Sequence, residues 1–256
     1  MTTGRTAVVV GVGAELGLGA GLARRLAREG YRVFVAGRAI DKLVQVARTI
    51  SDTGGDVVPV VADATSESDL AALFDYADDN GSLDLVVFNA GEGVGHEPES
   101  RSPQLFEQSW RLAALGGFLV GLEVARRLVP RRRGTAIFTG AIVDEQVAFA
   151  SARAALRSVV QSMARELAPL GVHVAQVFVD GGIDGARLNL STPRGARRGE
   201  DGLLNIDAIA DACWDLHQEH RSAWTHELNL RPFRRSFQRT WRENFNKTGV
   251  NHGPAE

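Results

Sequence analysis

The sequence predicts an α/β protein built on a doubly wound parallel sheet. Strand-like and helix-like segments alternate from near the start of the chain to about residue 230. The strand-like segments are apolar along most of their length, as strands covered on both faces are. The segments between them repeat apolar side chains at helical spacing. Strict alternation of this kind places helices on both faces of one parallel sheet.

The first half of the chain carries four predicted strands, each followed by a predicted helix. β-branched residues fill 6–10, and Leu18, Leu22 and Leu26 then share one face of a helix. Asp41 is the expected cap of the second helix, because its carboxylate can accept from a free N–H group at a helix start. The predicted strands are 6–10, 32–36, 57–61 and 83–88, and the predicted helices are 16–29, 41–50, 67–77 and 104–128.

The second half continues the alternation with three further strands. Pro130 and the arginines at 131–133 are expected to end the fourth helix, with the three cations as a solvated cap that opposes the helix dipole. A mobile loop rich in Gly, Arg and Ser is predicted around 180–203, and an irregular tail after 231. The predicted strands are 136–139, 172–179 and 225–230, and the predicted helices are 148–170 and 206–218.

Length and composition favour one globular domain over residues 1–256. The chain has 256 residues, a hydrophobic fraction of 44%, a formal net charge of −2 and one cysteine, Cys213. This balance gives no basic footprint for nucleic acid, and one cysteine allows no disulfide within the chain. No signal peptide, membrane span or metal-ligand spacing is recognised, so we expect a cytoplasmic protein without nucleic-acid, membrane or metal partners.

A glycine-rich turn joins the first strand to the first helix. It runs Gly11-Val12-Gly13-Ala14-Glu15-Leu16-Gly17-Leu18-Gly19. Glycines at this place let the backbone approach a pyrophosphate, and the following helix offers free N–H groups to its oxygens. Glycines could also serve only close packing of the turn, but their number and their strand–helix context favour a dinucleotide site.

This loop resembles the cofactor motif of the short-chain dehydrogenases/reductases. The resemblance rests on Gly13-x-x-x-Gly17-x-Gly19, on Asp63 after the third strand, and on Asn89-Ala90-Gly91 after the fourth, and it extends over about residues 5–230. Val12 departs from the family, which usually has a hydroxyl residue there. The resemblance implies a Rossmann-like fold and a nicotinamide cofactor.

The second predicted strand ends in Gly37-Arg38, where an NAD(H) enzyme would need a carboxylate for the ribose hydroxyl. Arg38 can instead hold a 2′-phosphate, which favours NADP(H) over NAD(H), although Glu15 could repel that phosphate. The segment 180–183 resembles the family's nicotinamide-contacting segment without its proline. The cofactor residues expected are Gly11, Gly13, Glu15, Leu16, Gly17, Leu18, Gly19, Arg38, Asp63, Ala64, Asn89, Ala90, Gly91, Arg153, Gly181, Gly182 and Ile183.

The positions that match the family's catalytic residues have all changed. Phe149 stands at the position of the tyrosine that donates the proton, and Arg153 at that of the lysine. Gly140 and Ala141 occupy the serine region, and Ala113 matches the asparagine. Arginine stays protonated and can hydrogen-bond ribose hydroxyls, but it cannot donate a proton to a substrate.

A substitute acid or base would have to come from the loops around the cleft. Thr139 and His96 are the candidates that we single out, and Glu92, Asp144, Glu145, Asp180 and Asp184 also follow strands. The chain's two tyrosines, Tyr31 and Tyr76, are expected far from this cleft.

Three hypotheses remain open. The first is an atypical NADP(H)-dependent oxidoreductase acting on a small carbonyl, imine or alcohol. The second is a non-redox enzyme that uses the same cleft; halohydrin dehalogenases share an arginine at the lysine position, but they keep the tyrosine and lose the nucleotide loop. The third is a non-catalytic nucleotide-binding or scaffold protein. A homodimer or homotetramer is expected through helices 104–128 and 148–170, with burial of Ala113, Ala114, Gly116, Gly117, Gly121, Ala154, Ala155 and Val159.

Overall fold

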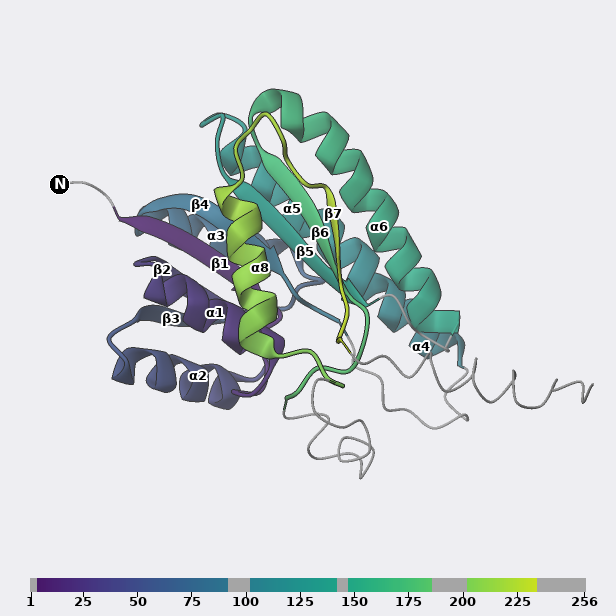
Figure 1. Ribbon diagram of the computed structural model, residues 1–256, viewed down its shortest axis with the longest axis horizontal. Helices are drawn as coiled ribbons and strands as arrows, with labels where there is room; N and C mark the ends of the chain where they lie inside the picture. Colours follow the sequence, from purple (N-terminus) through teal and green to yellow (C-terminus); the bar gives the residue numbers. More distant parts are fainter. Residues whose placement is uncertain (1–3, 92–101, 142–146, 186–201, 234–256) are drawn as a thin grey trace, which may run out of the picture.

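The computed structural model describes residues 4–91, 102–141, 147–185 and 202–233. Within these ranges seven parallel strands form one sheet in the order β3–β2–β1–β4–β5–β6–β7 (Figure 1). The predicted doubly wound α/β fold is therefore confirmed. The strands are β1 (Arg5–Val10), β2 (Arg32–Gly37), β3 (Asp56–Val61), β4 (Ser82–Phe88), β5 (Thr135–Ala141), β6 (His173–Val179) and β7 (Glu227–Leu230).

Helices cover both faces of the sheet (Figure 1). One face carries α1 (Leu18–Arg28), α2 (Ile40–Asp52) and α8 (Ile206–Gln218). The other carries α3 (Glu67–Asp79), α5 (Gly116–Leu128) and α6 (Val147–Leu167), and α4 (Pro103–Trp110) packs against α6.

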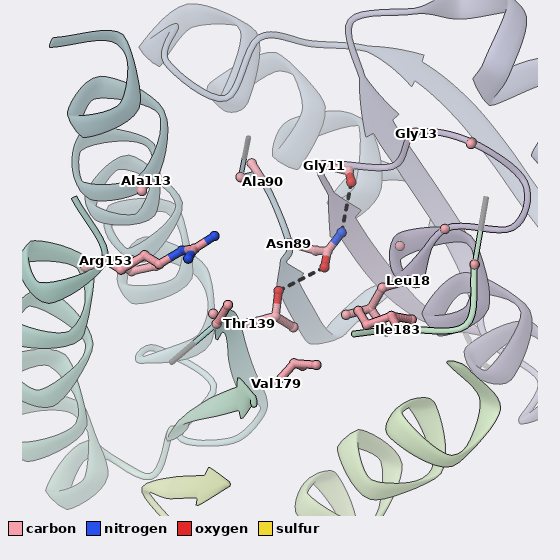
Figure 2. A pocket seen from close by; sticks show the side chains of 18 of the residues that line it. Gly11, Gly13, Leu18, Asn89, Ala90, Ala113, Thr139, Arg153, Val179 and Ile183 are labelled. Carbon is pink, nitrogen blue, oxygen red and sulfur yellow. Dashed lines mark hydrogen bonds between the residues drawn. The ribbon is translucent and has the colours of Figure 1, made fainter. Parts of the chain in front are cut away.

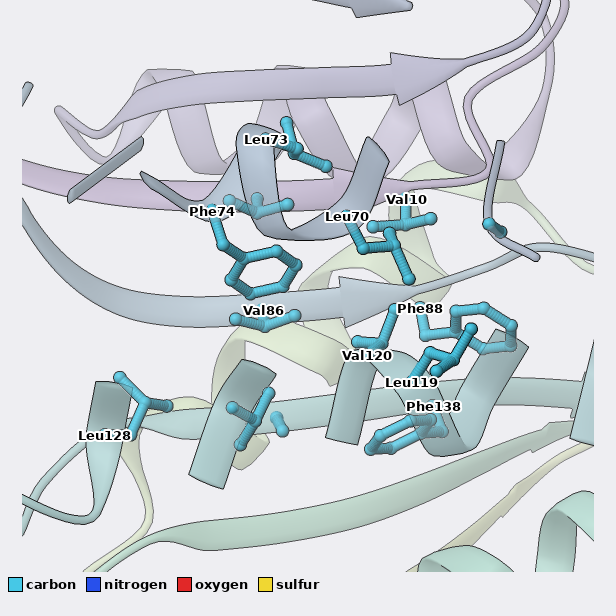
Figure 3. Packing of buried hydrophobic residues seen from close by; sticks show 14 of the residues in the cluster. Val10, Leu70, Leu73, Phe74, Val86, Phe88, Leu119, Val120, Leu128 and Phe138 are labelled. Atoms are coloured by element: carbon cyan, nitrogen blue, oxygen red, sulfur yellow. The ribbon is translucent and has the colours of Figure 1, made fainter. Parts of the chain in front are cut away.

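The alternation of side chains along each strand divides the core into two layers. Val8 and Val10 of β1 point to the layer under α3, α5 and α6, whereas Ala7 and Val9 point to the layer under α1, α2 and α8. Figure 3 shows Val10 in the first layer, together with Leu70 and Phe74 of α3 and Leu119 of α5. Because both faces of the central strands are buried, these strands are largely apolar, which is the pattern that predicted them.

Two predicted helices are interrupted. The helix predicted over 104–128 consists of α4, one π-helical turn (Arg111–Leu115) and α5. The helix predicted over 148–170 ends as an α-helix at Leu167 and continues as a 3₁₀ turn (Ala168–Leu170). Gly171 then takes a left-handed conformation with φ +87°, which stops the helix at little steric cost.

Two details of the helix and strand ends were predicted wrongly. Ala39, not Asp41, is the N-cap of α2, and Asp41 lies inside the first turn, where its charge still favours the positive end of the helix. The last strand begins at Glu227 rather than at 225, because the backbone N–H of Thr225 donates to the Glu219 carboxylate (2.6 Å) and not to the sheet.

The arginines at 131–133 are not only a solvated cap. Arg131 pairs with Asp78 at 2.9 Å and also donates to the carbonyl oxygen of Leu83. Arg133 lies 3.7 Å from Asp84 at the start of β4. Two of the three cations therefore fasten the end of α5 to the neighbouring α3–β4 connection.

In the part of the chain that the structure describes, no helix is both long enough and apolar enough to cross a bilayer.

Candidate functional site

A cleft of about 310 Å³ lies at the carboxyl ends of β1, β4, β5 and β6 (Figure 2). The chain reverses its direction across the sheet between β1 and β4, and ligands of such sheets bind at this point. Most of the predicted site residues line the cleft. They are Gly11, Gly13, Leu16, Gly17, Leu18, Gly19, Asn89, Ala90, Gly91, Ala113, Thr139, Gly140, Ala141, Arg153, Gly181 and Ile183.

The glycines of the loop serve two different purposes. Gly11 has φ +91°, and a Cβ there would lie 2.4 Å from the backbone nitrogen of Ala90. A Cβ on Gly19 would lie 3.0 Å from the carbonyl oxygen of Gly11. Close packing therefore explains these two glycines. Gly13 differs, because no described residue has an atom within 4 Å of the place of its Cβ, so its backbone faces open space in the described part of the chain.

The side chain of Asn89 ties the ends of three strands together (Figure 2). Its Nδ2 donates to the carbonyl oxygen of Gly11 after β1 (3.1 Å), and its Oδ1 accepts from the hydroxyl of Thr139 on β5 (2.9 Å). The Thr139 hydroxyl thus donates its hydrogen bond to a side chain that forms the framework of the cleft. This geometry makes Thr139 a positioning residue for Asn89 rather than an acid aimed at a substrate.

The residues expected around the adenosine half lie outside this cavity. Arg38 is exposed, directly after β2. A Cβ on Gly37 would lie 2.5 Å from the carbonyl oxygen of Val12, so Gly37 is required by the contact between loop and strand. The carboxylate of Glu15 accepts from Gln45 and from Thr49 on α2, at 2.9 Å each.

Asp63 shapes the turn that follows β3. Its Oδ1 accepts from the backbone N–H and the hydroxyl of Thr65, at 2.8 Å each. The backbone N–H of Asp63 and the hydroxyl of Ser66 both donate to Asp69, and these bonds lower the pKa of that carboxyl. Ala64 is buried, with its carbonyl against Gly116 of α5. Both Asp63 and Ala64 therefore have structural contacts in addition to the expected cofactor contact.

A family model described as short chain dehydrogenase matches residues 6–188. The chain belongs to this family.

Individual proteins of the family are similar to this chain over different lengths. The human dehydrogenase/reductase SDR family member 1 is 34% identical over 136 residues, which are 50% of this chain and 44% of the human protein. The match therefore spans less than half the length of that curated relative. A solved short-chain dehydrogenase from Rhodopseudomonas palustris is 33% identical, with a TM-score of 0.74 over 90% of this chain and 99% of the other.

Fold similarity extends further than sequence similarity. An actinorhodin polyketide ketoreductase solved with NADPH has a TM-score of 0.79 and 21% identity, and the match covers 91% of this chain and 98% of the ketoreductase. This likeness concerns the fold.

The positions that the sequence analysis matches to the family's catalytic residues lie in the cleft, with one exception. Ala113 is carried there by the π-helical turn, and Gly140 and Ala141 end β5. Arg153 points from α6 into the cleft, and it also has an interaction within the protein (Figure 2). Phe149, one turn earlier on α6, is only 4% exposed and does not line the cavity.

Several expectations fall elsewhere. His96 lies outside the described residues, as do Glu92, Asp144 and Glu145. Gly182 is described but does not line the cavity. Neither tyrosine lines the cleft, as expected. Tyr31 directly precedes β2 and hydrogen-bonds Asp84 near the start of β4, and Tyr76 of α3 packs on Phe34.

Four lining residues were not predicted from the sequence. Ala14 lies within the glycine loop, and Leu156 lies on α6 three residues after Arg153, so spacing alone could have indicated both. Val179 is the last residue of β6, and Gly185 closes the cleft against the carbonyl of Leu16. Gly185 carried no signal, because only the folded chain brings it to the loop.

Proposed function

We propose that the protein binds NADP(H) in this cleft and acts as an atypical oxidoreductase on a small carbonyl, imine or alcohol substrate. The observation that carries the proposal is the cleft itself. It joins the glycine loop, the turn from Asn89 to Gly91 and the segment around Gly181 and Ile183 at one edge of the sheet. These are three separate parts of the chain, and each matches a cofactor-binding element of the family.

The glycine loop and α1 fit a pyrophosphate. Gly13 offers open space to a ligand, and no side chain caps the first N–H groups of α1. The first turn of α1 also has no acidic residue. Free N–H groups and the positive end of the helix dipole attract phosphate oxygens.

Arg38 favours the phosphorylated cofactor. Its guanidinium stands exposed directly after β2, where it can hold a 2′-phosphate with two parallel hydrogen bonds. The carboxylate of Glu15 is engaged by Gln45 and Thr49 of α2, which limits its opposition to that phosphate.

Arg153 would serve the cofactor rather than donate a proton. Its guanidinium carries five N–H donors and stays charged at any working pH, so it can hold ribose hydroxyls. When bound, the cofactor supplies the hydride chemistry of the family. The proton that balances a carbonyl reduction would come from water or from a loop residue, because Phe149 has no hydroxyl.

One set of observations favours a second candidate, a nucleotide-binding protein without catalysis. Ala113, Gly140 and Ala141 have no ionisable side chains of their own, and Phe149 is buried. The location in the cytoplasm, the single domain over 1–256 and the homodimer or homotetramer remain proposals from the sequence.

Two measurements on the native protein test these proposals. Protein purified without added nucleotide is denatured, and released nucleotide is identified by mass spectrometry; added NADPH and NADH are then titrated by calorimetry. We expect NADPH to bind, and to bind more tightly than NADH. NADPH consumption is then followed with a panel of carbonyl and imine substrates. Binding without turnover would support the second candidate, and failure to bind either nucleotide would contradict both.

A further inference from the structure

The carboxylate of Glu15 fastens the glycine loop to α2. Its two oxygens accept from the Thr49 hydroxyl and the Gln45 amide, at 2.9 Å each. Its backbone oxygen accepts from Arg24 of α1, also at 2.9 Å. A single loop residue is thus held by side chains of two helices. Gln45 and Thr49 are four residues apart on α2, so they present their donors on the same side of that helix.

The glycine loop has a second attachment, to β2, the strand that precedes α2. The backbone N–H groups of Gly11 and Val12 both donate to the carbonyl oxygen of Ala36, at 2.9 Å each. The carbonyl of Val12 packs so closely on Gly37 that a Cβ there would approach it to 2.5 Å. The loop is therefore held to β2 at its first residues and to α2 at Glu15. Gly13 and Ala14 span the interval between the two attachments.

Arg38 leaves β2 between these two attachments. It follows Gly37, which contacts the loop, and it precedes α2, which binds Glu15. The two attachments, one before and one after Arg38 in the chain, therefore fix the distance between the glycine loop and the Arg38 turn. A nucleotide whose ribose lies between Gly13 and Arg38 would meet walls that are already in place, which reduces the ordering cost of binding.

We propose that Glu15 is a positioning residue that holds the glycine loop on α2 and so fixes the slot for the adenosine ribose and its 2′-phosphate. The inference rests on the proposed NADP(H) binding. Glu15 is acidic and lies beside a phosphate site, yet it would favour nucleotide binding. Its carboxylate accepts hydrogen bonds from the donors of α2. The remote residues Gln45 and Thr49 then influence nucleotide affinity only through Glu15.

Calorimetric titration with adenosine 2′,5′-bisphosphate tests the proposal, because this probe fills the adenosine half alone. We expect Glu15→Ala to weaken its binding about tenfold, as loss of hydrogen bonds to a charged group would. Thr49→Val should weaken it by a smaller factor, and should add nothing in the Glu15→Ala background. Glu15→Gln should bind within about twofold of the native protein, because its amide oxygen still accepts from Thr49 and the Gln45 amide can rotate to accept.

Thr53→Val is the matched control. Thr53 follows α2 and donates to the carbonyl of Ile50 at 2.8 Å, so the substitution removes a hydroxyl near the same helix without touching the loop. Affinity for nicotinamide mononucleotide, which does not reach the slot, should be unchanged in every variant. If Glu15→Ala does not fold, Thr49→Val and Gln45→Ala carry the test.

Three outcomes are distinguishable. Variants of Glu15 and Thr49 that bind the bisphosphate as the native protein does would overturn the positioning proposal. Glu15→Gln binding many times more tightly than the native protein would also overturn it, since the carboxylate would then act by repulsion. A native protein that binds neither the bisphosphate nor NADPH would instead contradict the proposed function.

Discussion

Arg153 and Phe149 lie one helical turn apart on α6, yet they belong to different surroundings. The guanidinium of Arg153 points into the cleft, whereas the ring of Phe149 is buried outside the cavity lining. Replacement of a tyrosine by phenylalanine removes a proton donor and leaves the packing of the helix intact. We therefore expect Arg153 to contribute to nucleotide binding and Phe149 to contribute to the packing of the core.

We expect Arg153→Ala to weaken NADPH binding by about 10–100-fold, as loss of charge-assisted hydrogen bonds would. Phe149→Ala should leave NADPH affinity nearly unchanged and lower the free energy of unfolding by about 3–5 kcal/mol. Calorimetric titration and chemical denaturation of both variants check this. Equal effects of the two substitutions on nucleotide affinity would contradict the division.

Phe149→Tyr should not restore ordinary ketone reduction. General acid catalysis contributes about 10²–10⁴ in rate only when the donor reaches the reacting oxygen, and the positions that we match to the family's serine and lysine also carry other residues. NADPH consumption with a panel of simple ketones measures the result, with the native protein as reference. Turnover of the native protein at rates usual for the family would show that another residue donates the proton.

We propose that Arg38 gives the protein its preference for NADPH over NADH. Arg38→Ala should weaken NADPH binding by about 10–100-fold and leave NADH binding unchanged, because only NADPH carries the phosphate that the guanidinium holds. Arg48→Ala is the matched control, since it removes one exposed cation from α2 and leaves the Arg38 turn intact. If the two substitutions weaken NADPH binding equally, the preference depends on the overall positive charge of this surface and not on Arg38 itself.

Among the elements, α8 is fastened to the amino-terminal edge of the sheet by buried polar groups. His217 of α8 hydrogen-bonds the Tyr31 hydroxyl (2.9 Å) and the Thr135 hydroxyl (2.8 Å), and Tyr31 donates to Asp84 (2.8 Å). Burial lowers the pKa of His217, and the nearby Arg5 of β1 and His173 of β6 lower it further. The carboxylate of Asp84 on β4 acts in the opposite direction and raises this pKa. Burial and the Asp84 carboxylate raise the pKa of Tyr31.

This network predicts acid sensitivity. Burial lowers the pKa of His217 in the folded chain, whereas an unfolded histidine has its ordinary pKa of about 6.5, so the unfolded chain binds more protons as pH falls. Stability should therefore be fully present well above pH 6.5 and decrease below it. His173, whose pKa burial also lowers, adds to the same trend. Thermal unfolding of the native protein and of His217→Gln between about pH 8 and pH 5 measures this.

The His217→Gln variant should lose less stability on acidification than the native protein. Its matched control is His220→Gln, since His220 is exposed beyond the end of α8. An acid transition that is identical in the native protein and in His217→Gln would assign the sensitivity to other groups.

For the molecule as a whole, the sequence predicted the order of elements and the walls of the cleft. Both depend on local signals: apolar strands, and small residues placed directly after them. The adenosine side was less predictable, because Glu15 is bound by Gln45 and Thr49, which no spacing connects with it. Only some of the small residues predicted for a subunit contact remain accessible: Ala154 is exposed, and Ala155 and Val159 are half-buried. Gly117 and Gly121 are buried against Leu156 and Met163 of the same chain, so they serve packing between α5 and α6.

The expected subunit contact therefore keeps Val159 and gains other residues of the same helices. Ala113, Ala114 and Gly116 are also buried within the chain, whereas Phe106, Trp110 and Phe118 are 43–44% exposed along α4 and α5. Beside Phe118, α5 and α6 enclose a groove of about 320 Å³ lined by residues such as Leu122, Val159 and Met163. A largely apolar groove beside an exposed aromatic ring suits a symmetric contact in which each copy receives the other's ring.

We therefore expect a dimer or tetramer by light scattering at micromolar concentration, and we expect Phe118→Glu to shift it toward monomer. The substitution places a charge in the apolar contact, where its desolvation would be opposed by no partner. Tyr76→Glu is the matched control, because Tyr76 is an aromatic residue of similar exposure on α3 and does not line this groove. Dissociation by Phe118→Glu alone would place the interface on α5 and α6. A native protein that is monomeric at this concentration would contradict the assembly, and the exposed rings of α4 and α5 would then need another explanation.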